Sequence, residues 1–486
     1  MSVDCCMSAP SSPVADVAII GGGFSGTAVA AQLLRRANTP LRLVLIERYS
    51  HQLHRGVAYA TPLADHLLNV RACDMSAYPD DPDHFLRWVA ARDDFQDELP
   101  LAVRFLPRGL YGDYLSELVD HAEALSPVGN CLERCLAEAT AVTATTAGAI
   151  VQLADGRRLA ARHVVLALGN SSPRLPPALA ALADSERMIA DPWAGTGLDI
   201  PTDARCLVLG SGLTSVDCLL TLLRQGHRGQ LYALSRRGLW PQPHGDPVTA
   251  AELPDPLPPR LTALTAWLRH QAAAVSDWRP LVEALRRRSE QIWQTLPEAD
   301  RRRFLRHLKP YWDAHRHRIS PYAQQRLQRL LDDGRLHALR GRIVAGSRHG
   351  ATLRVEYRPY GSRGTQILEV DHVINCTGPD SGVGPTAHPL VKDLLARGLA
   401  ARDPLGLGLL VDEDGRLLDA ANLPSPVLSL LGPPCRGPRW ESTAVPDIRN
   451  QALAIAERLL REIHSPRERV VAARPDLRAA PLGAPA

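Results

Sequence analysis

The stretch IIGGGFSGTAVAAQLLRRA, residues 19–37, constrains the fold of this chain more than any other segment. The apolar run that leads into it, DVAII, predicts a short parallel strand buried on both faces. Gly21, Gly23 and Gly26 then give the spacing GxGxxG, and small residues open the helix that follows. Glycines at this spacing permit a tight turn, let the backbone approach a pyrophosphate and let helix and strand touch. The segment therefore predicts a dinucleotide-binding unit.

A second apolar segment, LRLVLIE (residues 41–47), supports this interpretation. It ends in Glu47, about twenty residues beyond the last glycine, where a carboxylate accepts hydrogen bonds from ribose hydroxyls. A glutamate there also repels a 2′-phosphate, so we expect FAD or NAD at this turn and not NADP. The residues assigned to this first site are Gly21, Gly23, Phe24, Ser25, Gly26, Glu47, Arg48 and Gly169.

Residues 204–226 repeat the same plan, with Ser215 in the third glycine position. After the next strand, Ser235, Arg236 and Arg237 stand where the first unit has its acid. Guanidinium and hydroxyl groups there suit a 2′-phosphate, which favours NADPH over NADH; the alternative is a solvated arginine pair at a strand end. The residues assigned to this second site are Gly210, Gly212, Leu213, Thr214, Ser215, Ser235, Arg236, Arg237 and Gly378.

The repeat predicts an α/β protein with two Rossmann-like dinucleotide-binding domains and a helical insertion. The length of 486 residues agrees, because one hydrophobic core stops growing at about 250–300 residues. Each unit closes with a hairpin and an apolar strand, the first before the second glycine turn. The expected segments are a flexible tail at 1–14, an FAD-binding domain at 15–198 and 379–465, an NADPH-binding domain at 199–378 with its helical insertion at about 250–335, and a flexible tail at 466–486.

Composition narrows the function classes. A net charge of +4 is too small to indicate binding to nucleic acid or an anionic membrane. No apolar stretch reaches the roughly 18 residues of a membrane helix and the N-terminus lacks a signal-peptide pattern, so we expect a cytoplasmic protein. Nine cysteines without a CxxC pair make disulfides and thiol chemistry unexpected. His315 and His317 lack a third ligand motif, so no metal site is expected.

Several longer motifs extend over nearly the whole chain. They include GVAYATPLADHLLNVRACDMSAYPDDPDHFLRW (56–88), PRGLYGDYL (107–115), SRRGLWPQPH (235–244), INCTGP (374–379) and WESTAVPDIR (440–449). With these motifs the chain resembles a bacterial FAD/NAD(P)-binding protein family that is related to flavin-dependent N-hydroxylating monooxygenases.

This resemblance implies a class-B-like monooxygenase that uses FAD, NADPH and O2. In such enzymes NADPH reduces the flavin, a flavin C4a-hydroperoxide forms, and one oxygen passes to a small nucleophile. The expected substrate is the amine nitrogen of an amino acid or related metabolite. The FxGxxxHxxxW pattern of Baeyer–Villiger enzymes is not found before the second glycine turn, where MIADPW stands, so a ketone is a less favoured substrate. The oligomeric state stays open.

The resemblance also suggests residue roles, with structural alternatives. Asn69 would lie near the isoalloxazine or the nicotinamide, or would cap a turn. Arg316 or Arg318 would bind a substrate carboxylate, Trp440 and Glu441 would line the flavin cleft, and His244 would reach the nicotinamide. Three further residues would bind groups near the adenine or hold the domain together: Arg108, Tyr111 and Tyr114.

Two other functions fit the same glycine turns. One is an NADPH-dependent flavin reductase that passes electrons to a small acceptor or a partner protein. The other is a non-catalytic redox sensor that responds to FAD and NADPH.

Overall fold

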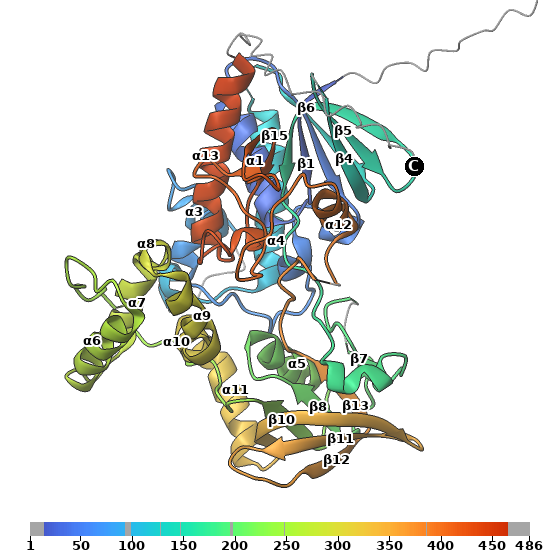
Figure 1. The fold of residues 1–486 in the computed structure, drawn as a ribbon, viewed down its shortest axis with the longest axis vertical. Coiled ribbons are helices and arrows are strands. Elements are labelled where there is room, and N and C mark those ends of the chain that lie inside the picture. Colours follow the sequence, from blue (N-terminus) through green and yellow to red (C-terminus); the bar gives the residue numbers. More distant parts are fainter. Residues whose placement is uncertain are drawn as a thin grey trace, which may run out of the picture.

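A computed structural model describes residues 14–92, 99–126, 128–145, 147–194, 198–246, 248–384 and 386–464. Two β-sheets form the cores of two α/β units, and a group of helices extends beside them (Figure 1). The predicted tails at 1–14 and 466–486 lie outside these ranges, apart from residue 14. Within the described ranges no helix has the length and hydropathy needed to cross a bilayer.

The first sheet has the strand order β14-β15-β6-β1-β2-β3, and the β4–β5 hairpin continues from β6. Strand β1 is parallel to both of its neighbours, β2 and β6, as the apolar run before the first glycine turn predicts. The strands are β1 (Ala15–Ile20), β2 (Arg42–Glu47), β3 (Cys131–Leu136), β4 (Ala139–Thr145), β5 (Gly148–Leu153), β6 (Arg158–Leu166), β14 (Arg416–Leu418) and β15 (Pro424–Leu430).

Helices cover both faces of this sheet. One core contains apolar residues of β1 and β2 together with those of three helices, of which the first packs on these strands and the other two pack on that helix. A second core includes a short helix that packs on β4. The helices of the first core are α1 (Phe24–Arg36), α4 (Arg108–Ala124) and α13 (Val445–His464), and the short helix of the second is α12 (Pro389–Ala396). The first sheet and its helical layers therefore include elements from the C-terminal part of the chain. Smaller helices before α4 are α2 (Gly56–Tyr59) and α3 (His84–Ala90).

The second sheet has the strand order β12-β11-β10-β9-β8-β13-β7. Its strands are β7 (Met188–Ile189), β8 (Cys206–Leu209), β9 (Leu231–Ser235), β10 (Leu336–His349), β11 (Thr352–Pro359), β12 (Gln366–Val370) and β13 (His372–Asn375). The helices α5 (Leu213–Arg224) and α11 (Pro321–Asp332) contribute to the core on one face. This arrangement and the first sheet confirm the two-domain α/β fold class.

Two segments lie elsewhere than the sequence suggests. Residues 177–189, expected in the first domain, pack on the second sheet, where β7 pairs with β13. Leu179 and Leu182 account for this placement, because they are fully buried in the second sheet's core, where their segment packs on β10. Helix α11, expected within the helical insertion, packs on α5 and belongs to the second sheet's own helical layer.

The insertion proper consists of five helices that extend to one side of the two sheets (Figure 1). They are α6 (Leu261–Ala273), α7 (Arg279–Arg287), α8 (Ser289–Thr295), α9 (Glu298–His307) and α10 (Lys309–Arg316). This group agrees with the helical periodicity of the sequence.

Candidate cofactor and substrate site

The first glycine turn joins β1 to α1 and has no room for larger residues. Gly21 has a φ of 105°, and a Cβ on it would lie 2.3 Å from the carbonyl oxygen of Ala167. A Cβ on Gly26 would lie 2.0 Å from the Gly21 carbonyl oxygen. Helix α1 then begins at Phe24, and its N-cap residue, Gly23, supplies no capping side chain. The first N–H groups of the helix have no intrahelical acceptors, so the turn fits a pyrophosphate.

Glu47 is held firmly at the end of β2. One carboxylate oxygen accepts a hydrogen bond from the Gly22 N–H at 2.8 Å, and the other accepts from the Tyr49 N–H at 3.1 Å. The residue is buried, so its carboxylate is fixed next to the turn. Arg48 turns away, because its guanidinium lies over the Tyr49 ring and 3.8 Å from the Glu138 carboxylate.

A short segment around His54 packs against the first turn. A Cβ on Gly23 would lie 3.3 Å from Gly56 Cα, so backbone meets backbone at this point. The Thr27 hydroxyl in α1 lies 3.4 Å from His54 Nδ1. Burial, followed by the charge of Arg134, lowers the pKa of His54 to about 4. The imidazole is therefore neutral at physiological pH.

The second glycine turn, between β8 and α5, is more open. Gly210 resembles Gly21, with a φ of 110° and a Cβ position 2.4 Å from the Cys376 carbonyl oxygen. A Cβ on Gly212 would meet nothing within 4 Å. Helix α5 begins directly after it with Leu213 and Thr214, again without a capping side chain. The exposed backbone of Gly212 can accept an approaching pyrophosphate.

The end of β9 carries the residues expected to select NADPH. The Ser235 hydroxyl accepts a hydrogen bond from the Gly238 N–H at 2.9 Å, and Arg236 is exposed. Arg237 donates to the Arg306 carbonyl oxygen at 3.0 Å, so its side chain is tied to the insertion. Arg236 is thus the guanidinium best placed to meet a phosphate. Gly169 and Gly378 lie just beyond β6 and β13, at the same sheet edges as the two turns.

A buried ion pair fixes one unit against the other. Arg108, at the start of α4, makes two hydrogen bonds to Asp217 of α5, at 2.8 and 3.3 Å. Nearby, His66 Nε2 lies 2.9 Å from the Thr221 hydroxyl of the same helix. Removing one partner of a buried pair leaves the other charge uncompensated and costs about 3–5 kcal/mol. The pair therefore sets the position of the second glycine turn relative to the first.

The three parts of the molecule meet around His244. His244 Nε2 lies 3.1 Å from the Asn69 carbonyl oxygen, which places both of these sequence-derived candidates at one junction. Arg71 donates to the Gly245 carbonyl oxygen, and Arg279 of the insertion donates to that of Pro243 at 3.2 Å. Burial lowers the pKa of His244 to about 4, so its ring is neutral.

Eight buried polar atoms without a hydrogen-bond partner lie either on the segments around His244 or on those around Glu441 and Asp447, and six others lie elsewhere in the described residues. Since most buried polar atoms in proteins are paired, each unpaired atom needs an explanation, and a bound ligand is one of them. The atoms are Arg71 Nε, His244 Nδ1, Arg279 Nε, Arg316 Nε, Arg318 Nε, Ser442 Oγ, Asp447 Oδ2 and Arg449 Nε. Described residues include no group of three or more side chains that could hold a metal ion.

Arg316 and Trp440 lie together but make contacts within the protein. The Arg316 guanidinium lies 3.1 Å from the Glu441 carboxylate, and both side chains are about nine-tenths buried. The Trp440 ring stacks on Trp293 of the insertion, with centroids 4.6 Å apart. Because Arg316 already has an anionic partner, its binding of a substrate carboxylate stays a prediction. Tyr111 and Tyr114 are fully buried in the first core, in keeping with their structural alternative.

Sequence reasoning missed Asp447, in the first turn of α13. Burial raises the pKa of Asp447 to about 6, and the neighbouring Arg286 guanidinium limits the rise. One turn later, Gln451 accepts a hydrogen bond from the Gly432 N–H at 3.0 Å, and a Cβ on Gly432 would lie 2.8 Å from the Ser25 hydroxyl of the first turn. Asp447 therefore lies on the helix that adjoins the first turn and faces the insertion. The one sequence signal for Asp447 is its position within the motif WESTAVPDIR.

Comparisons with known proteins agree with this geometry. Residues 18–171 match a family described as FAD-NAD(P)-binding. No curated protein sequence matches the chain. Among solved structures, an ornithine N-hydroxylase from Kutzneria sp. 744 is 16% identical to this chain, with a TM-score of 0.61. The match covers 93% of this chain and 100% of the hydroxylase chain. An L-lysine 6-monooxygenase from Pseudomonas syringae is 21% identical with a TM-score of 0.62, with the same coverage.

A bacillithiol disulfide reductase from Staphylococcus aureus is also similar, at 12% identity and a TM-score of 0.56, over 93% of this chain and 99% of its own. At these identities the likeness shows the fold alone. Residues 18–171 thus match the FAD-NAD(P)-binding model, within a chain that has the fold of flavoproteins with two dinucleotide-binding domains.

Proposed function

We propose that this protein is an FAD- and NADPH-dependent monooxygenase that hydroxylates the amine nitrogen of a small molecule. The balanced reaction converts the amine, O2, NADPH and a proton into the hydroxylamine, water and NADP⁺. Bound FAD supplies hydride acceptance from NADPH and the reaction with O2. The observation that carries the proposal is the junction at His244, where Asn69 of the first unit and Arg279 of the insertion contact the segment Pro243–His244 of the second unit and His244 Nδ1 is buried without a partner.

The residues of the chain have distinct tasks in this proposal. The first glycine turn and Glu47 hold the FAD pyrophosphate and ribose, and the second turn with Arg236 holds NADPH. His244 donates from Nε2 to Asn69, which leaves Nδ1 as an acceptor for an N–H such as that of the nicotinamide amide. The Arg108–Asp217 pair keeps these groups in register across the domain boundary.

Asp447 is the candidate proton acceptor. Its Oδ2 atom is buried without a partner, so it can accept a hydrogen bond from the substrate amine. A carboxylate with a pKa of about 6 can take up the proton that the nitrogen releases as it gains oxygen, because efficient acid–base groups titrate near the working pH. The insertion, which contacts the loop before this helix at Trp440 and Glu441, would help to exclude water.

Two observations bear on the choice among flavoprotein functions. The solved structures with the higher TM-scores include enzymes whose names specify hydroxylation of ornithine and oxygenation of lysine, both of which carry side-chain amines. A dithiol reductase needs a reactive thiolate, whereas the Cys376 thiol, 3.5 Å away, and burial raise the pKa of Cys218 well above its usual value. The oxygenase is therefore favoured over a thiol reductase.

The decisive experiment supplies FAD-loaded protein with NADPH, isotopically labelled O2 and single amines, including lysine, ornithine and n-alkylamines. We expect one amine to give a hydroxylamine that contains one labelled oxygen, detected by mass spectrometry, with little hydrogen peroxide released. NADPH oxidation that yields only peroxide with every amine would favour the reductase alternative. Tight binding of both nucleotides without NADPH oxidation would favour the sensor.

A matched pair of variants tests Asp447. Asp447→Asn should lower kcat at least tenfold and remove the limb near pH 6 from the profile of kcat/KM, while FAD content is unchanged. Glu457→Gln removes a half-exposed carboxylate farther along the same helix and should leave both quantities unchanged. Equal behaviour of the two variants would remove Asp447 from the mechanism.

A further inference from the structure

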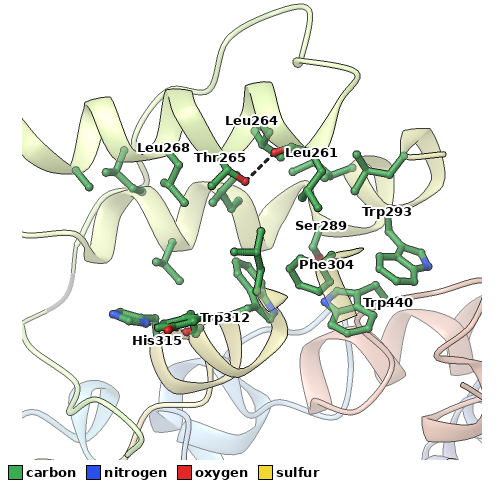
Figure 2. Close-up of a pocket in the computed structure, with 18 of the residues that line it drawn as sticks. Leu261, Leu264, Thr265, Leu268, Ser289, Trp293, Phe304, Trp312, His315 and Trp440 are labelled. Carbon is green, nitrogen blue, oxygen red and sulfur yellow. Dashed lines mark hydrogen bonds between the residues drawn. The ribbon is translucent and has the colours of Figure 1, made fainter. Parts of the chain in front are cut away.

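The helical insertion forms an apolar cavity that is partly open to solvent (Figure 2). Its volume is about 290 Å³, enough for roughly ten water molecules. Side chains from all five insertion helices line it, and Trp440 of the loop before α13 forms part of its wall. Figure 2 shows Leu264 and Leu268 of α6 on the opposite side of the cavity from Trp312 and His315 of α10.

The lining is chemically uniform. Among the residues that the structure describes, none that lines the cavity is an aspartate, glutamate, lysine or arginine. Several of its polar groups are engaged in the protein: Thr265 donates to the Leu261 carbonyl oxygen at 2.7 Å, and Trp293 Nε1 donates to that of Gly437 at 2.8 Å. A charged group placed inside would lose its hydration without a compensating partner. The cavity therefore suits an uncharged apolar group.

One residue of the cavity wall, Trp440, is next in sequence to the charged pair of Glu441 and Arg316. Trp440 contacts the insertion by stacking on Trp293 and meeting the Phe304 ring edge-on at 5.3 Å. The next residue, Glu441, is the partner of Arg316 and one of the charges that act on Asp447. The cavity wall and the charges around Asp447 therefore meet at two consecutive residues, Trp440 and Glu441.

We propose that this cavity binds the apolar arm, alkyl or aryl, of an amine substrate. The identification of the ligand as substrate rests on the proposed function, whereas binding of an apolar amine in the cavity does not. The proposal separates this chain's substrate class from free diamino acids, whose second charged end would enter an uncharged cavity. Filling the cavity also restores dispersion contacts that its lining residues lack when it is empty.

Binding can be measured without catalysis. Isothermal titration calorimetry of the FAD-loaded full chain, without NADPH, would use n-alkylamines from propylamine to octylamine. Affinity should rise about fourfold for each added methylene until the cavity is full, because each buried methylene adds a similar increment. The α,ω-diamine with the octylamine chain length should bind at least tenfold more weakly than octylamine, since its second charge loses hydration.

Two adjacent alanines at the end of α6 provide matched variants. Both are exposed, but only Ala272 lines the cavity, so Ala272→Trp fills it from the rim and Ala273→Trp adds the same bulk outside. Ala272→Trp should weaken octylamine binding at least tenfold and leave propylamine binding and FAD content unchanged. Ala273→Trp should change none of these.

The outcomes separate the two proposals. Equal affinity for propylamine and octylamine, or equal effects of the two tryptophan variants, would overturn the cavity assignment. Octylamine that binds through the cavity but is never hydroxylated would uphold that assignment and contradict the proposed oxygenation. Hydroxylation of short or charged amines with no dependence on chain length would support the proposed oxygenation and contradict the cavity assignment.

Discussion

The two glycine turns share one plan but differ in how tightly the protein surrounds them. At the first turn, Gly56 packs on Gly23 and the Glu47 carboxylate is buried with two backbone hydrogen bonds. At the second, Gly212 faces open space and Arg236 is exposed. A nucleotide at the first turn would be enclosed, and one at the second would exchange. This difference suits a resident FAD and an NADPH that enters and leaves in each cycle.

The largest expected effect follows from the crowded first turn. Gly26→Ala places a methyl group 2.0 Å from the Gly21 carbonyl oxygen, and such a contact forces the helix away from the strand. We expect the purified protein to lose essentially all of its FAD, measured as the ratio of flavin to protein absorbance.

Gly212→Ala is the counterpart in the open turn. Its methyl group meets no protein atom within 4 Å, so FAD content should stay at the wild-type level while the NADPH KM rises several-fold. Full flavin content in Gly26→Ala, or loss of flavin in Gly212→Ala, would contradict the assignment of FAD to the tightly packed first turn and of NADPH to the open second turn.

An intermediate effect is expected at the nucleotide-selecting end of β9. Arg236→Ala should raise the NADPH KM about tenfold and change the NADH KM less than twofold, because only NADPH carries the 2′-phosphate. Steady-state oxidation of each nucleotide measures this. Arg237→Ala is the informative comparison, since Arg237 is bound to the Arg306 carbonyl oxygen. A larger effect at Arg237 would reverse our assignment of the phosphate contact.

The smallest effect concerns acid pH and the first turn. The pKa of His54 is lowered to about 4 by burial, whereas an unfolded histidine titrates near 6.5. The unfolded state therefore binds more protons than the folded state between these values, and stability is complete above pH 6.5 and falls as the pH drops towards 4. At pH 5.5 the loss from this residue is about 1 kcal/mol.

His54→Asn tests this contribution while retaining a residue type that tolerates the positive φ of 64° at this position. Thermal unfolding and flavin release, followed at pH 7.5 and 5.5, should differ less between the two pH values for the variant than for the wild type. Identical pH dependence would show that other groups control acid stability.

The sequence predicted those features that depend on neighbouring residues. The glycine spacing, the acid at the end of β2 and the arginines after β9 are local patterns, and the two-domain α/β fold follows from their repetition. The helices of residues 261–316 are also predictable, because leucine and tryptophan recur there at helical spacing.

Features that depend on distant residues could not be predicted. Arg108 and Asp217 belong to different units, and nothing local to either indicates that they form a buried pair. The sequence does not show which sheet buries Leu179 and Leu182. It therefore predicts that the chain enters the second unit at residue 199, later than the structure shows. The apolar cavity arises from the angles between insertion helices, which periodicity does not determine.

The interrupted order of the first unit has a consequence for synthesis on the ribosome. The segments that build the second unit lie between residues 177 and 375, so that unit is complete in one continuous stretch. The first unit still lacks β15 and α13, the helix that packs on α1, when this stretch has emerged. Domains generally fold as units during translation, so the second unit can fold first, and the flavin can be enclosed only when nearly the whole polypeptide has been made.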